Sequence, residues 1–108
     1  KMIISGGCRI LQDGTLEFNS HVWTMELTAA ASTYTWTRQA ATSGKSERAG
    51  HSAVMVGSSM VVFGGYGLSA KTSCATTQTA SCIVSYYDTW RLSVSDWSWT
   101  EVVALNPP

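Results

Sequence analysis

The sequence predicts an all-β protein made of four-stranded antiparallel sheets, and two observations lead to this class. First, one pattern occurs twice: an apolar run, a pair of glycines, a polar gap, a Trp-containing strand and a second Trp-Thr. The copies occupy residues 3–7, 22–27 and 36–37, and then residues 61–65, 89–94 and 99–100. Such a repeat indicates stacked copies of one supersecondary unit, neither of which buries its apolar face alone. Second, no window combines a 3.6-residue apolar period with capping residues, which argues against helices.

The first unit, residues 1–41, is expected to supply the second, third and fourth strands of one sheet. Residues 1–5 form a strand that ends at the first glycine pair, and residues 8–19 are expected to form a loop around Asp13-Gly14. The next two strands, 20–27 and 34–38, are separated by small residues at 28–33, of which 29–31 are alternatively one helical turn.

The second unit, residues 42–108, is expected to be a complete sheet. A polar connection over 39–50 leads to strands 51–56 and 59–63, and Gly57-Ser58 between them suits a type II′ hairpin. A long loop over residues 64–85, of which 66–85 is the Thr/Ser-rich part, precedes strands 86–94 and 97–103. The Asn-Pro-Pro sequence at 106–108 resembles the start of a linker. Because two such units cannot close a circular array of sheets, we expect a longer polypeptide, or an array completed by other copies or chains.

The apolar runs at 2–4 and 60–63 do not alternate with polar residues. Strands of this kind are covered on both faces. Sheets that stack face to face around an axis meet this condition, which favours a β-propeller.

The same landmarks resemble the kelch repeat, over nearly the whole chain and about one and two-thirds repeats. The matching residues are Gly6-Gly7, Gly64-Gly65, Trp36, Trp99, Arg48-Ala49-Gly50-His51-Ser52, Asp88-Thr89-Trp90 and, loosely, His21-Val22-Trp23. The sequence departs from the family at Met25 and Leu92, where an aromatic residue is common, and it lacks a proline before Arg48. The resemblance implies a β-propeller whose blades are the two units.

Each landmark has a structural role that its chemistry explains. The glycines Gly6, Gly7, Gly64 and Gly65 leave room for a neighbouring backbone. The four tryptophans Trp23, Trp36, Trp90 and Trp99 are expected to pack between sheets. Arg48 has five donors with which to tie loop carbonyls together, and it lies with Gly50 and His51 in the connector between the units.

Strand parity indicates the binding face. Because antiparallel strands alternate in direction, the segments 8–19, 40–50 and 66–85 are expected to share one rim, and long loops on rigid scaffolds carry binding residues. The candidate partner-binding residues on these segments are Arg9, Lys45, Arg48, Tyr66, Lys71 and Tyr86. The function expected is a protein-interaction scaffold with a protein partner and no catalytic residues.

The oxidation state of the cysteines would indicate whether the protein is exported or cytoplasmic. Cys74 and Cys82 lie eight residues apart in one polar segment, either as a disulfide in an exported protein or as two unrelated thiols. An oxidised pair would favour an extracellular or secretory protein, and a reduced pair a cytoplasmic one. Cys8 is left to pair elsewhere or to be a buried thiol.

Two further functions remain open. One is a segment of a kelch-propeller enzyme, such as a metal-dependent oxidase, whose active centre lies on other blades, since some kelch-containing proteins are enzymes, such as the copper-dependent galactose oxidase family. The other is an extracellular carbohydrate-binding or adhesion module, which predicts that the Cys74–Cys82 disulfide is formed.

Other classes lack their signals. A net charge of zero and 13% charged residues give no basic patch for nucleic acid, and no apolar stretch reaches the ~18 residues that span a bilayer. The two histidines, His21 and His51, have no carboxylate at ligand spacing, so no metal or other cofactor is expected. Gly65-x-Gly67-x-x-Ala70, with Asp88 beyond it, fits a dinucleotide motif. That motif needs a following helix, which the Thr-rich residues 73–82 do not favour, so a helix beginning near Lys71 would reopen this interpretation.

Overall fold

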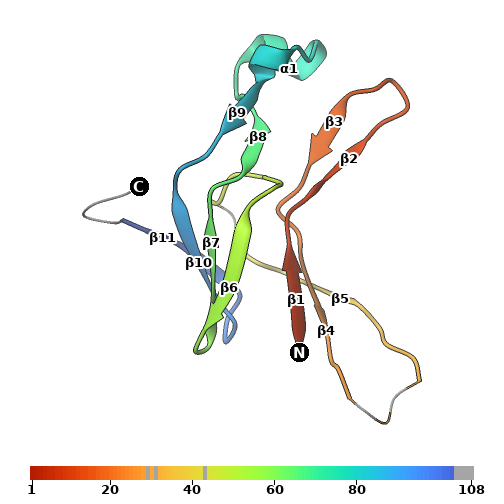
Figure 1. The fold of residues 1–108 in the computed structure, drawn as a ribbon, viewed down its shortest axis with the longest axis vertical. Helices are drawn as coiled ribbons and strands as arrows, with labels where there is room; N and C mark the ends of the chain where they lie inside the picture. The colour runs from red at the N-terminus through yellow and green to blue at the C-terminus, as the bar shows by residue number, and fades with distance from the viewer. Residues whose placement is uncertain (29, 31, 43, 104–108) are drawn as a thin grey trace.

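The structure is a computed structural model that describes residues 1–28, 30, 32–42 and 44–103. It confirms the all-β, antiparallel class (Figure 1). The strands are β1 (Met2–Ser5), β2 (Cys8–Ile10), β3 (Leu16–Phe18), β4 (Val22–Met25), β5 (Thr37–Gln39), β6 (Ser52–Val56), β7 (Ser59–Phe63), β8 (Tyr66–Leu68), β9 (Ile83–Ser85), β10 (Thr89–Ser93) and β11 (Ser98–Val102). The helical segments in the described part of the chain are α1 (Thr72–Thr76) and the 3₁₀ turn η1 (Ala80–Cys82).

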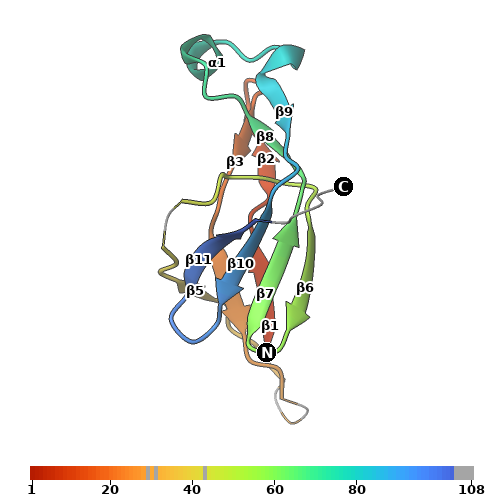
Figure 2. The ribbon, with the colours of Figure 1, turned by 90° about the vertical axis from the view of Figure 1, so that its left-hand side faces the viewer.

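The strands form two sheets and two hairpins. The first sheet has the order β1-β4-β5, and the second has the order β11-β10-β7-β6. The sheets lie as two layers, with the second in front of the first in Figure 2. The hairpins β2–β3 and β8–β9 extend from the same end of these layers (Figure 1).

The core lies between the two sheets. Its buried members are Val22 from the first sheet and Met60, Val62, Leu92 and Trp99 from the second. Half-buried Ile3, Ala41, Trp90 and Trp97 pack around them. The alternation follows the pleat, because neighbouring residues of a strand point to opposite faces. Each sheet therefore buries one face against the other.

Within this chain each apolar run is covered on one face only, and the second cover expected from further stacked sheets is not supplied by the described residues. Phe63, on the outer face of the second sheet, is 37% exposed. Ile4, on the outer face of the first sheet, is 47% exposed. The described residues place no third layer on either side, so both outer faces stay open.

Two segments expected to be loops contain paired strands. Residues 8–19 hold the hairpin β2–β3, and residues 66–85 hold β8, α1, η1 and β9. Both hairpins are held by backbone pairing rather than by an apolar stripe, and β2 is exposed throughout. Composition alone therefore predicts loops for both segments.

Smaller differences concern the ends of strands. Trp97 lies in the turn 94–97 with a φ of 57°, not in the last strand, although its ring still packs at the edge of the core. Trp36 lies just before β5. The turn at Gly57-Ser58 joins β6 to β7 as expected. The alternative helical turn at 29–31 depends on residues 29 and 31, and the linker at 106–108 also lies outside the described residues.

A helix does begin directly after Lys71, where the sequence argued against one. It is five residues long, and the disulfide between Cys74 and Cys82 joins it to η1. A dinucleotide fold requires the helix to connect two parallel strands. Here β8 and β9 flank the helix and pair antiparallel, with Gly67 opposite Val84. The helix is therefore the tip of a hairpin, and the dinucleotide interpretation does not follow from it.

Candidate interface between two hairpins

Residues of the three segments 8–19, 40–50 and 66–85 line one cleft. Its walls belong to the hairpins β2–β3 and β8–β9, which lie at the same end of the molecule (Figure 1). The cleft measures about 720 Å³. It is lined by Leu11, Thr15, Leu16, Glu17, Phe18, Ser46, Glu47, Leu68, Ser69, Ala70, Ala75, Gln78, Val84 and Tyr86. The hairpins β2–β3 and β8–β9 form its walls, and the connector between the sheets lies between them.

Hydrogen bonds fix the two hairpins at the base and at the tip. At the base, the Gly7 amide donates to the Arg48 carbonyl at 2.8 Å, while Ala49 and Tyr66 exchange two backbone hydrogen bonds of 2.9 Å. At the tip, the Gln78 side chain accepts from the Leu16 amide at 2.8 Å and donates to the Leu16 carbonyl at 2.7 Å. The Gln78 amide thus pairs with β3 as a strand backbone would. The spacing of the walls is set before any ligand binds.

Arg48 organises the base of this cleft from inside the protein. Its side chain is fully buried and forms a two-pronged ion pair with Asp88, with Nη2 and Oδ2 3.0 Å apart. It also donates to the carbonyls of Gly64 at 3.0 Å and Ser46 at 3.2 Å. The ring of Tyr86 covers the guanidinium at 4.3 Å. The expected role in tying carbonyls together is what the structure has, whereas Arg48 is wrong as a partner-binding residue because no part of its side chain reaches the surface.

Asp88 completes the network. Its Oδ2 also accepts from Nε1 of Trp90 at 2.8 Å. The hydrogen bond from Arg48 lowers the pKa of the Asp88 carboxyl to about 2, against a smaller opposing effect of burial. The Asp-x-Trp landmark is therefore a hydrogen-bonded pair, and its arginine partner lies 40 residues earlier in the chain.

Lys45 is also wrong as a partner-binding residue. It is 6% exposed, and its ammonium lies 4.8 Å from the centre of the Trp99 ring. Burial lowers the pKa of Lys45 to about 8. The Lys45 side chain thus packs over the edge of the core and is not exposed on the rim.

Of the other four candidate partner-binding residues, some lie in or near the wall of the cleft and others lie outside it. Tyr86 lines the cleft. Tyr66 packs edge-on against Phe18, with ring centres 5.8 Å apart, and its ring covers Gly50. The side chains of Arg9 and Lys71 are exposed and outside the residues that line the cleft. Arg9 pairs with Glu17 at 2.7 Å.

Two cleft residues escaped the sequence reasoning. Glu47 is exposed and forms no ion pair with any residue that the structure describes. Gln78 lies in a Thr-rich run of the sequence, and its role in joining the hairpins follows only from its hydrogen bond with Leu16. A charged connector residue beside Arg48 was the available signal for Glu47, while Gln78 had none.

The glycine pairs meet the connector closely. A Cβ on Gly6 would lie 2.6 Å from the Arg48 carbonyl oxygen, and one on Gly65 would lie 2.6 Å from that of Ala49. Gly7 and Gly64 contribute backbone hydrogen bonds instead, through the Gly7 amide and the Gly64 carbonyl.

His51 lies between the two glycine pairs, and burial lowers its pKa. Its Nδ1 is buried and has no hydrogen-bond partner among the described residues. The expectation that His51 acts as a hydrogen-bonding group of the connector is therefore not met at Nδ1.

The tryptophans behave differently in the two sheets. Trp99 and Trp90 belong to the core between the sheets. Trp23 and Trp36 lie on the opposite, open face of the first sheet, around a hollow that Ile4 also lines. The expectation that all four pack between sheets is met within this chain by the second unit and not by the first.

The structure shows the state of all three cysteines. Cys74 and Cys82 form a disulfide, and both are buried. Cys8 is exposed and free in the part of the chain that is described, so the expectation of a buried thiol is wrong. Cys8 lies at the start of β2, where its side chain is directed to solvent.

Across the described ranges, no three His, Cys, Asp or Glu side chains lie close enough to hold a metal ion. None of the helices described has the length and apolar character needed to cross a membrane. No protein-family model and no curated protein matches the chain.

Proposed function

We propose that this chain is part of a kelch-type β-propeller that acts as a protein-interaction scaffold, and that the hairpin cleft is its binding site. The propeller interpretation draws support from two separate, stacked sheets and from glycine pairs that both contact one connector. The observation that carries the function is that the three connecting segments line a single cleft whose walls are fixed at both ends.

The chemistry of the cleft favours a peptide segment as the ligand. Its walls carry aliphatic and aromatic side chains, among them Leu16, Phe18 and Leu68. The carboxylate of Glu17 is paired with Arg9, which leaves Glu47 to attract a basic group. An extended peptide with an apolar side chain next to Lys or Arg fits this combination, and the charge would set the specificity.

A carbohydrate is the second candidate, because the Cys74–Cys82 disulfide suits an exported protein. Aromatic side chains at the cleft are already engaged within the protein: Tyr86 covers Arg48, and Tyr66 contacts Phe18. These contacts leave less ring surface for a sugar, which favours the peptide.

A library of displayed random peptides, selected on the immobilised chain, tests the proposal. We expect enriched peptides to carry a basic residue beside an apolar one, and Glu47→Lys to weaken their binding by about tenfold or more, as loss of a close charge pair does. Glu101→Lys makes the same charge change on β11, away from the cleft, and should leave affinity within about twofold.

Failure to enrich such peptides, or equal binding by both variants, contradicts the proposal. Binding on a glycan array that Glu47→Lys abolishes would assign the cleft to carbohydrate instead.

A further inference from the structure

The open face of the first sheet matches the covered face of the second. Alignment of the glycine pairs and the tryptophans relates β1 to β7, β4 to β10, and Trp36 to Trp99. The covered face of the second sheet presents Met60, Val62, Trp90, Leu92 and Trp99. The repeat-equivalent residues of the first sheet are Met2, Ile4, Trp23, Met25 and Trp36.

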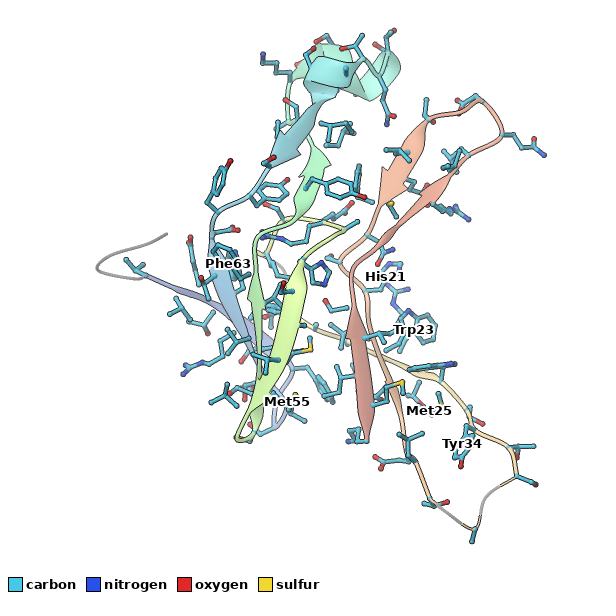
Figure 3. All side chains as sticks on the ribbon, in the orientation of Figure 1. His21, Trp23, Met25, Tyr34, Met55 and Phe63 are labelled. Atoms are coloured by element: carbon cyan, nitrogen blue, oxygen red, sulfur yellow. A yellow bond between two sulfur atoms is a disulfide. The ribbon has the colours of Figure 1, made fainter. Side chains whose placement is uncertain are left out.

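These five first-sheet residues, here named the tryptophan face, point away from the second sheet. In the register of β1 with β4, Met2 lies opposite Met25 and Ile4 lies opposite Trp23. Figure 3 shows Trp23 and Met25 on the side of the first sheet that is remote from β6 and β7. Trp36 is 39% exposed, whereas its equivalent Trp99 is buried. Side chains at equivalent positions of the repeat are thus covered in the second unit and open in the first.

The outer face of the second sheet is the counterpart. It consists of Val54, Val56, Val61, Phe63 and Val102, here named the valine face. Val61 is the repeat-equivalent of Ile3, which packs against the core between the two sheets. Val54 is 60% exposed. Figure 3 shows Phe63 pointing away from the first sheet.

The area of the chain agrees with two uncovered interfaces. The accessible surface is 7253 Å² for 11.6 kDa, whereas a compact monomer of this mass exposes about 5,800 Å². The excess of about 1,400 Å² includes the projecting hairpins as well as the open faces, and it is of the order of the about 800 Å² that one partner contributes to a stable interface. The molecule is a slab of 49 × 41 × 21 Å, two sheets thick, with a broad apolar area on each side.

We propose that a second copy of this chain binds head to tail, with the tryptophan face of one copy on the valine face of the next. The contact would repeat the one that already joins the two sheets inside each copy. Because the two faces differ, every association leaves one of each kind free, and assembly proceeds to rings or open chains. Arg38 and Arg91 lie on these faces, opposite Trp23 and Val61 in their sheets, and their planar heads can stack on tryptophan rings.

The two faces and the hairpin cleft are separate surfaces of the molecule, so peptide binding at the cleft can fail while self-association holds.

Sedimentation velocity of the 108-residue chain over a range of concentrations tests the proposal. We expect a mass above the 11.6 kDa of the monomer that increases with concentration. Ile4→Lys places a charge on the tryptophan face, and Val54→Lys places one on the valine face. Each variant alone should remain monomeric, because each has lost one of two complementary surfaces. Both positions are about half exposed or more, so far-ultraviolet circular dichroism should match the wild type.

Mixing the two variants gives the decisive result. Each retains the face that the other has lost, so an equimolar mixture should form a dimer although neither variant does so alone. Gln12→Lys, the same added charge at the tip of β2–β3, should associate as the wild type does.

Three outcomes would overturn the proposal. The wild-type chain could keep a mass of 11.6 kDa throughout. Either variant could associate as strongly as the wild type. The mixture could fail to form the dimer.

Discussion

The guanidinium group of Arg48 joins three parts of the chain that are far apart in sequence. It reaches Ser46 in its own connector, Gly64 at the end of β7 and Asp88 before β10. A buried charge of this kind is tolerated only with its partners in place. The sequence indicated that Arg48 binds carbonyls, but its pairing with Asp88 spans 40 residues and no local pattern reveals it.

Replacing Arg48 with methionine should lower the free energy of unfolding by about 3 kcal/mol or more, because Asp88 and the Gly64 carbonyl lose their partner. Urea denaturation measures the loss. Arg9→Met is the matched control: it breaks an exposed pair with Glu17 and should cost less than about 1 kcal/mol. Equal losses in the two variants would show that Arg48 does not organise the connector.

The Asp88 carboxyl should make stability depend on pH in the acid range. Its pKa in the folded protein is about 2, below the ordinary value of 3.8. The folded state therefore holds fewer protons than the unfolded state, and the stabilisation is complete above about pH 4 and is lost as the pH falls towards 2. The amount is on the order of 2 kcal/mol.

Denaturation series at several pH values, for the wild type and for Asp88→Asn, measure this term. The variant should be less stable at neutral pH and should lose less stability between pH 4 and 2. An unchanged pH profile in Asp88→Asn would rule out this carboxyl as its source.

At the scale of elements, the glycine pairs end β1 and β7 where the connector crosses them. The first glycine of one pair and the second of the other make the close approach: Gly6 to Arg48, and Gly65 to Ala49. Hence the two pairs are not used identically, although the sequence repeats them. The sequence predicted the need for space, and the structure identifies which glycine of each pair meets it.

Gly65→Ala should therefore be more destabilising than Gly7→Ala, its equivalent in the repeat. Both have a positive φ, 97° and 110°, so the backbone strain of alanine is similar. Only Gly65 has a carbonyl oxygen 2.6 Å from the new Cβ, whereas the Gly7 position is open. We expect the difference in unfolding free energy to exceed about 1 kcal/mol, measured by urea denaturation. A larger loss in Gly7→Ala would contradict this account.

The hairpins show the limit of sequence reasoning for elements. The strands of the two sheets follow from apolar runs and tryptophans, and their order along the chain was predictable. β2–β3 and β8–β9 are polar and short, so their stability comes from contacts such as Gln78 with Leu16, which lie 62 residues apart. The position of the rim was predictable from strand direction, but its walls were not.

At the scale of the whole molecule, the chain is a three-stranded and a four-stranded sheet of related sequence that share a core. The repeat in sequence predicted that the copies would stack. It did not reveal that the tryptophans of the first copy face outwards, because the face a strand presents depends on which neighbour is in place. A molecule with one apolar face covered and its equivalent open is suited to further association.

Nuclear Overhauser contacts of the Val22 methyl groups test the stacking most directly. Val22 is the buried contribution of the first sheet to the core, and the other buried members come from the second sheet. In a methyl-labelled sample, we expect cross-peaks from Val22 to Met60, Val62 or Leu92. If Val22 shows contacts only with residues of β1, β4 and β5, the two sheets do not share a core.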